Sequence, residues 1–111
     1  MQLHVSSGHI LHSGGALPAL HPVLEAREIR SLVVVVYDYM AFPRGAPSRN
    51  LFAYSTTSGK LAWRAEDIGQ GATDGYTSII SEQPLVVGNF AGFNCTIDPN
   101  SGKVLAKAFT K

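Results

Sequence analysis

Residues 50–65 read NLFAYSTTSGKLAWRA, and residues 93–108, which read FNCTIDPNSGKVLAKA, align with them without a gap. In both segments apolar residues alternate with other residues, a polar turn follows, and Ser-Gly-Lys lies at the same place. Alternation is typical of a β-strand, and a polar turn between two such strands is typical of a β-hairpin. The two segments therefore predict two hairpins, with Gly59 and Gly102 at positive φ angles where the turns end.

Turn-forming residues divide the rest of the chain into short apolar segments, the spacing of a protein built from sheets. We expect an opening hairpin in which Ser6–Gly8 joins a strand at Gln2–Val5 to a strand at His9–Ser13. Further strands are expected at Val23–Ile29, Leu32–Met40, Tyr76–Ile80 and Leu85–Phe90. Glycine and proline residues predict loops over Ser13–Pro22 and Phe42–Ser48.

Two of these segments, Val23–Ile29 and Leu32–Met40, have patterns that differ from that of a simple half-buried strand. Val23–Ile29 is rich in helix-forming residues and follows Pro22, but its apolar residues make no helical stripe, which favours a strand over a helix. Leu32–Met40 carries apolar side chains on both faces, so it is expected to be a central strand that is covered on both sides.

The whole chain is predicted to be a single, mainly β domain comprising residues 1–111. Because the pattern repeats about every forty residues, the expected architecture is a small antiparallel sandwich or barrel-like domain made of two similar units. Residues 69–75, which contain three glycines, are interpreted as the connection between the units, and they lack the Gly-Lys-Ser/Thr ending of a phosphate-binding loop.

Composition and charge exclude several classes of partner. The net charge is +1, and the basic residues are scattered from Arg27 to Lys111, so no basic surface for nucleic acid is expected. The longest apolar run, Leu32–Tyr37, is far shorter than the roughly 20 residues that span a bilayer. The first residues lack the pattern of a secretory signal, and Cys95 is the one cysteine, so a cytoplasmic location is expected.

The two aligned hairpins resemble the repeat hairpin of quinoprotein-type β-propellers, in which an apolar strand, a turn ending in Gly-Lys and a tryptophan-containing strand recur. From Pro22 onward the chain is also similar to small stand-alone bacterial proteins of unassigned function. The propeller resemblance implies a β-sheet scaffold, and no cofactor-binding residue lies in the part that matches. Since a propeller closes with about four blades, two units have to close on themselves or pair with a second copy.

Four histidines, His4, His9, His12 and His21, lie in the first fifth of the chain and raise the question of a metal site. If Val5 pairs with His9, His4 and His12 lie diagonally on one face of the hairpin and His9 lies on the other. Two ligands do not complete a stable metal site, and no acidic residue or cysteine lies nearby in the sequence. We therefore assign no metal-binding residue.

Other candidate motifs are also interpreted as structural. Residues 98–102 form a hairpin turn rather than a calcium loop, because the twelfth position is Phe109 where a calcium loop needs glutamate. Residues 94–96 fit the glycosylation pattern but lie in an expected strand. Trp63 and Cys95 are expected in the core, and Asp38 is expected where its strand emerges from the core. The sequence assigns no catalytic, cofactor-binding or metal-binding residue and no cofactor.

These observations favour a non-enzymatic interaction module that forms a homodimer. Binding to a different protein partner is also consistent with them. The alternatives are a small-molecule-binding β-barrel and, as a lesser one, a small enzyme. An enclosed apolar cavity would favour ligand binding, and a polar cleft joining His4 or His12 to Asp38 would favour catalysis. An apolar outer face would favour association. In a competing arrangement Gln2–Ser13 and Val23–Ile29 fold over the second unit and close the domain unaided.

Overall fold

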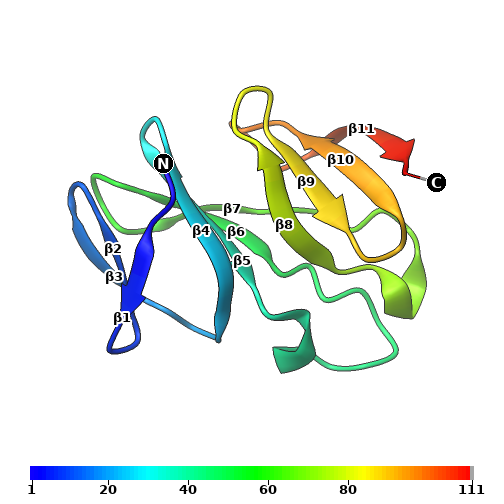
Figure 1. Cartoon of the computed structure of the whole chain (residues 1–111), viewed down its shortest axis with the longest axis horizontal. Helices are drawn as coiled ribbons and strands as arrows, with labels where there is room; N and C mark the ends of the chain where they lie inside the picture. The colour runs from blue at the N-terminus through cyan, green and yellow to red at the C-terminus, as the bar shows by residue number, and fades with distance from the viewer. Residues whose placement is uncertain (111) are drawn as a thin grey trace.

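The computed structural model describes residues 1–110, which form mainly β-strands in three antiparallel sheets (Figure 1). The strands are β1 (His4–Ser6), β2 (His9–His12), β3 (Gly15–Pro18), β4 (Val23–Ile29), β5 (Leu32–Tyr37), β6 (Leu51–Ser55), β7 (Leu61–Arg64), β8 (Tyr76–Ser81), β9 (Val86–Asn89), β10 (Phe93–Ile97) and β11 (Val104–Phe109). Two 3-10 helices, η1 (Tyr39–Ala41) and η2 (Gly71–Thr73), lie in the loops. The predicted mainly β class is confirmed.

The central sheet has the strand order β4-β5-β6-β7 and is buried on both faces. Alternation along β5 explains how, because Val34 and Val36 pack toward β8–β11 whereas Val33 and Val35 pack toward β1–β3. The prediction of a central strand that is covered on both sides is therefore confirmed. The segment Val23–Ile29 is also a strand, β4, as predicted.

The third sheet has the order β11-β10-β9-β8 and, like the central sheet, follows the chain from one strand to the next. Both predicted hairpins are present, as β6–β7 and β10–β11. Gly59 and Gly102 have φ angles of 71° and 77°, which confirms the prediction for the two turns. Trp63 and Cys95 are buried in the core between the central and third sheets, also as predicted.

The first sheet has the order β1-β2-β3 and differs from the sequence prediction in two respects. Residues 13–22 are not wholly a loop, because β3 pairs with β2 and ends at Pro18, where an edge strand needs no amide donor. The opening hairpin is present, but Val5 pairs with Ile10 and not with His9. The turn is Ser7-Gly8 and not Ser6–Gly8, which shifts the strand register by one residue. Each side chain of β2 therefore lies on the face opposite to the predicted one.

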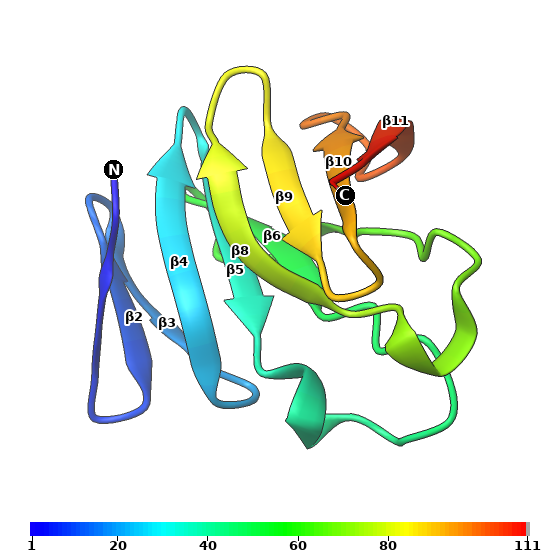
Figure 2. The same ribbon diagram turned by 45° about the vertical axis from the view of Figure 1, so that its right-hand side comes forward.

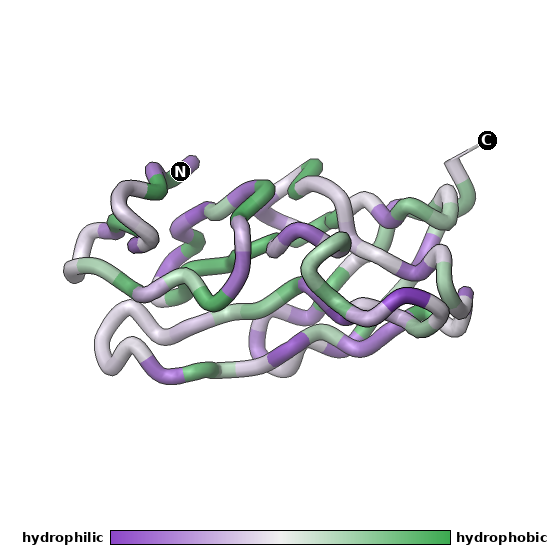
Figure 3. The backbone as a smooth tube through the Cα atoms, turned by 90° about the horizontal axis from the view of Figure 1, so that it is seen from below, coloured by the Kyte–Doolittle hydropathy of each residue, from purple (hydrophilic) through white to green (hydrophobic). Residues whose placement is uncertain are grey.

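The three sheets lie one after another across the molecule in a sandwich-like arrangement that does not close into a barrel in the part of the chain described (Figure 2). One core lies between the central and third sheets and the other between the first and central sheets. Figure 3 shows the hydrophobic stretches along the strands in the middle of the molecule and hydrophilic stretches in many of the turns.

The same contact recurs between successive sheets. Leu17 of β3 lies beside the turn of the β6–β7 hairpin, where a Cβ atom on Gly59 would come within 3.2 Å of Leu17 Cδ2. Trp63 of β7 lies beside the turn of the β10–β11 hairpin, where a Cβ atom on Gly102 would come within 2.6 Å of Trp63 Cε3. The indole Nε1 of Trp63 also donates a hydrogen bond of 2.8 Å to the Pro99 carbonyl oxygen. In both cases a side chain from the last strand of one sheet packs against the glycine-containing hairpin turn of the next sheet.

Two further expectations are corrected. The strand expected over Leu32–Met40 ends at Tyr37, because the Asp38 carboxylate accepts a hydrogen bond of 2.9 Å from the Met40 amide and begins η1. The residues Gln2–Ser13 and Val23–Ile29 do not fold over the second unit: β4 belongs to the central sheet, and β1–β2 cover that sheet. Within residues 1–110, no helix is long and apolar enough to cross a membrane.

Candidate functional site

Asn50 joins the central and third sheets through a set of buried hydrogen bonds. Its Nδ2 donates to the carbonyl oxygens of Tyr37, at 2.6 Å, and Tyr76, at 2.8 Å. Its Oδ1 accepts from the Tyr76 amide at 2.8 Å and from the Ser48 hydroxyl at 3.0 Å. All four hydrogen-bonding positions of the amide are filled, so this fully buried side chain fixes the end of β5 against the start of β8.

Asp74 organises the loop that leads into β8 in a similar way. Its carboxylate accepts hydrogen bonds from the Ile68 amide at 2.7 Å, the Gln70 amide at 3.2 Å and the Asn89 side chain at 3.0 Å. Its own carbonyl oxygen accepts from the Ser48 amide at 3.1 Å. The buried charge is therefore satisfied by several donors and ties the loop before β8 to β9 and to the loop before β6.

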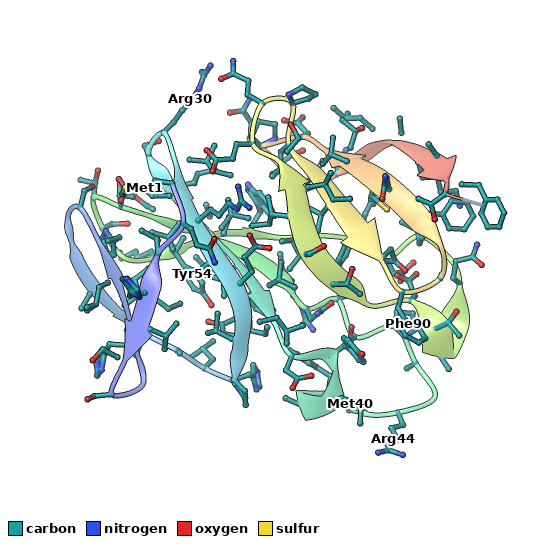
Figure 4. All side chains as sticks on the ribbon, viewed as in Figure 1. Met1, Arg30, Met40, Arg44, Tyr54 and Phe90 are labelled. Carbon is teal, nitrogen blue, oxygen red and sulfur yellow. The ribbon has the colours of Figure 1, made fainter. Side chains whose placement is uncertain are left out.

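These two loops line a pocket of about 450 Å³ that is open to solvent and that we call the loop pocket. The residues that line it come from η1 and the loop after it, from the loop containing η2, and from the turn after β9: Tyr39, Met40, Phe42, Pro43, Arg44, Gly45, Ala46, Ser48, Ala72, Thr73, Asp74, Gly75 and Phe90. Figure 4 shows Phe90 on one side of this end of the molecule and Met40 and Arg44 on the other. The walls are mainly aromatic and aliphatic.

A second pocket of about 390 Å³, the turn groove, lies between the central and third sheets at the end where their hairpin turns meet. Trp63, Leu32, Leu85 and Ile97 contribute apolar surface, and Arg30, Glu82 and Asn100 are among its polar lining residues. The Glu82 carboxylate is already bound to the N-terminal amine at 2.8 Å and to Arg27 at 3.2 Å.

Within residues 1–110, five of the six sheet edges carry a feature that hinders the addition of another strand. In the first sheet, β1 is only three residues long and β3 ends at Pro18. The edge of β4 is covered by the residues before β1, where the Leu3 amide donates to the Ala26 carbonyl oxygen at 2.9 Å. Short strands, proline and covering segments are all means by which natural sheets protect their edges.

Charged side chains occupy two further edges. Beside β7, the Arg49 guanidinium donates to the carbonyl oxygens of Ala65, at 3.2 Å, and Arg64, at 3.5 Å. Beside β8, the Glu25 carboxylate accepts a hydrogen bond of 2.8 Å from the Ile79 amide. The Arg64 carbonyl oxygen and the Ile79 amide, which these side chains bind, are backbone groups that an added strand would need.

The sixth edge, that of β11, is the most open. The Glu66 carboxylate accepts from the Val104 amide at 2.8 Å, but the five residues after Val104 are all exposed. The Lys107 ammonium does not project from this edge, because it donates to the Ile68 carbonyl oxygen at 3.2 Å and lies 5.1 Å from the centre of the Phe93 ring. Figure 1 shows β11 as the outermost strand of its sheet, next to the C-terminus, and Figure 3 shows a hydrophobic stretch there.

The structure does not assemble the histidines into a site. With the observed register, His4 and His9 share one face of the first sheet and His12 lies on the other, the reverse of the predicted arrangement. The His12 Nδ1 accepts from the Gly14 amide at 3.1 Å, and the His21 ring packs 4.5 Å from the Phe42 ring. Among the described residues, no three histidine, cysteine or acidic side chains are grouped so that they could hold a metal ion.

The other candidates occupy structural positions. Burial raises the pKa of the Cys95 thiol to about 11, so the thiol is protonated and unreactive near neutral pH. Asp38 caps η1, and the residues lining the loop pocket and the turn groove do not include His4, His12 or Asp38. Residues 98–102 form a hairpin turn, as predicted.

Sequence reasoning missed the residues that build the loop pocket. Asn50 and Asp74 were not singled out, although a polar residue directly before an apolar strand, and an aspartate within a glycine-rich loop, are signals of backbone capping. Phe42–Ser48 was correctly predicted as a loop, but its partner, the loop containing η2, lies nearby only in three dimensions.

Residues 6–109 match a family model that is described as a domain of unknown function, DUF7957. The chain belongs to this family. The matched region runs from the last residue of β1 to the end of β11, so it includes all of the strands from β2 to β11. No curated protein and no solved structure matches the chain.

Proposed function

We propose that this DUF7957 domain is a non-enzymatic interaction module that forms a homodimer through the edge of β11. The observation that carries the proposal is the contrast between this edge and the other five. A sheet edge with exposed apolar positions is a template for pairing with another strand.

The backbone of β11 supports the proposal. The Thr110 amide donates to the Gly92 carbonyl oxygen at 2.8 Å, so Thr110 faces the neighbouring strand. Because hydrogen-bonding directions alternate along an antiparallel strand, the amides of Phe109 and Lys107 face away from β10. These amides are available to an added strand, and the exposed side chains of Leu105 and Phe109 provide apolar surface beside them.

A second copy is the partner that needs the fewest assumptions. Closed two-fold dimers are the commonest homo-oligomers, and antiparallel pairing of β11 with its twin satisfies two-fold symmetry. The net charge of +1 offers little repulsion between copies. The dimer would join the two third sheets into one continuous sheet.

The test is the mass in solution at micromolar concentration, measured by sedimentation equilibrium. The wild-type protein is expected at twice the 11.9 kDa of one chain. The double variant Leu105→Lys/Phe109→Lys, which places charge on the exposed edge, is expected to be monomeric. Lys107→Pro should have the same effect without added charge, because it removes an amide that faces away from β10.

A matched control is Leu20→Lys/Leu61→Lys, which adds the same charge at two exposed leucines on other elements. The control should remain dimeric. A wild-type mass near 11.9 kDa across the accessible concentrations would refute self-association, and dimers that persist in the β11 variants would refute the assigned edge.

We also propose that the domain is related to quinoprotein-type β-propeller repeats and that it is located in the cytoplasm. The propeller resemblance rests on the two aligned segments, which form the β6–β7 and β10–β11 hairpins. The location is supported by the buried, unpaired Cys95, since a reducing compartment requires no disulfide.

A further inference from the structure

The loop pocket has the size and composition of a small-molecule site. Its volume of about 450 Å³ lies within the roughly 300–1,000 Å³ typical of ligand pockets. The rings of Tyr39 and Phe90 form a tilted pair with their centres 5.8 Å apart, and Phe42 and Pro43 add apolar surface. Met40 and Phe90, which line the same pocket, are 59% and 62% exposed, so their apolar surface is accessible to a ligand.

The floor of the pocket is held in place by backbone contacts. The Phe90 amide donates to the Gly75 carbonyl oxygen at 2.8 Å, and the Ser48 amide donates to the Asp74 carbonyl oxygen. A Cβ atom on Gly75 would lie 3.1 Å from Tyr39 Cβ and 3.3 Å from Ser48 Oγ, so a larger residue at position 75 would push the two loops slightly apart. The pocket is therefore preformed by the chain.

Two charged side chains of opposite sign line the pocket, the Arg44 guanidinium and the Asp74 carboxylate. Asp74 is the acidic residue that lines the pocket, and both of its carboxylate oxygens are occupied by donors from the chain. Arg44, on the rim, takes part in none of the ion pairs of residues 1–110. Close by, burial and the neighbouring Arg49 guanidinium lower the pKa of Arg64, whose side chain stacks 5.6 Å from the centre of the Phe42 ring.

From this combination we propose that the loop pocket binds a small aromatic molecule that carries a negative charge, such as a planar aromatic carboxylate. Tyr39 and Phe90 would contact the ring of the ligand, because aromatic rings associate through offset or edge contacts. The Arg44 guanidinium would reach its anionic group, since guanidinium groups recognise carboxylates with directed hydrogen bonds. This site is separate from the β11 edge, so it can be tested independently of dimer formation.

The experiment compares two fluorescent probes with similar aromatic rings, the anionic 1-anilinonaphthalene-8-sulfonate and the neutral N-phenyl-1-naphthylamine, in titrations of the full chain. The anionic probe is expected to bind more tightly. Arg44→Met should lower the affinity for the anionic probe by about tenfold, the scale of one charge-assisted hydrogen bond, and leave the affinity for the neutral probe unchanged. Phe90→Ala should lower the affinity for both probes because it removes part of the aromatic wall of the loop pocket.

Two matched controls locate the binding. Arg30→Met removes an exposed arginine on the rim of the turn groove and should leave both affinities unchanged. Leu61→Ala removes a large apolar side chain that is 53% exposed and lies outside both pockets and the β11 edge, and it should also have no effect. Thermal unfolding of each variant shows whether a lost affinity reflects a lost fold.

Four results would overturn the proposal. Equal binding of the neutral and anionic probes would exclude recognition of charge, and an unchanged anionic affinity in Arg44→Met would exclude the assigned cation. An equal loss in Arg30→Met would show that the probe responds to overall charge. Backbone amide shifts confined to residues outside 39–48, 72–75 and 90 on titration would place the probe elsewhere.

Discussion

Gly102 shows how one residue couples local conformation to packing between sheets. Its φ angle of 77° is unfavourable for residues with a Cβ atom, and the face of the Trp63 indole ring occupies the space where that atom would lie. Gly59 has the same conformation at the equivalent turn, but its neighbour, Leu17 Cδ2, is the end of a flexible side chain. The two glycines therefore have the same backbone conformation, but only Gly102 packs against a rigid aromatic ring.

We predict that Gly102→Ala destabilises the protein more than Gly59→Ala. The positive φ angle should cost each variant about 1 kcal/mol, and the contact with Trp63 should add about 1–3 kcal/mol in Gly102→Ala only. Gly45→Ala is the matched control, because Gly45 has a φ angle of 84° and no neighbouring atom within 4 Å. Urea unfolding measures the three variants, and equal midpoints for Gly102→Ala and Gly45→Ala would contradict the packing argument.

At the scale of elements, local patterns predicted the strands well and the connections less well. Alternation and glycine turns located both hairpins, and apolar residues on both faces identified β5 as central. The short β3 was missed because Gly15 and Pro18 are residues that usually interrupt strands, and both are tolerated here at a sheet edge. The loop pocket could not be predicted, since Asn50 and Asp74 find their partners through contacts between distant segments.

Replacing Asn50 should break the connection between β5 and β8. In Asn50→Leu, the carbonyl oxygens of Tyr37 and Tyr76 and the Tyr76 amide each lose a buried partner, at about 1–3 kcal/mol for each group left unsatisfied. We expect a loss of several kcal/mol or failure to fold. Asn94→Ala, at a partly buried position of β10, is the control and should cost far less. A variant Asn50→Leu with wild-type stability in urea would show that the network contributes nothing.

At the scale of the whole molecule, the central sheet contributes to both cores, and polar contacts join the three sheets at their ends. The Ser13 hydroxyl and amide, in the turn of the first sheet, donate to the Glu28 carboxylate of β4. The Glu82 carboxylate, in the turn between β8 and β9, binds the N-terminal amine and Arg27 of β4. Two glutamates thus connect the central sheet to its two neighbours.

These contacts should make the protein less stable in acid. Hydrogen bonds from Ser13 hold the pKa of Glu28 below its usual 4.5, and bonds from the N-terminal amine and Arg27 do the same for the pKa of Glu82. A carboxyl with a depressed folded-state pKa contributes stability above the unfolded-state value and loses it as the pH falls through the folded-state value. Unfolding midpoints in urea should therefore be level from neutral pH to about pH 5 and then decline toward pH 3.

Ser13→Ala tests the origin of that decline. Without the serine hydroxyl, the pKa of Glu28 rises toward 4.5, and the slope between about pH 5 and pH 3 should become shallower. Because both carboxylates are partly exposed to solvent, screening keeps the change small. Ser58→Ala is the matched control, since Ser58 lies at the corresponding turn of the β6–β7 hairpin and its hydroxyl accepts from the Lys60 amide instead of binding a carboxylate. If Ser13→Ala and Ser58→Ala lose stability with the same slope as the wild type, the bond from Ser13 to Glu28 is not part of the acid response.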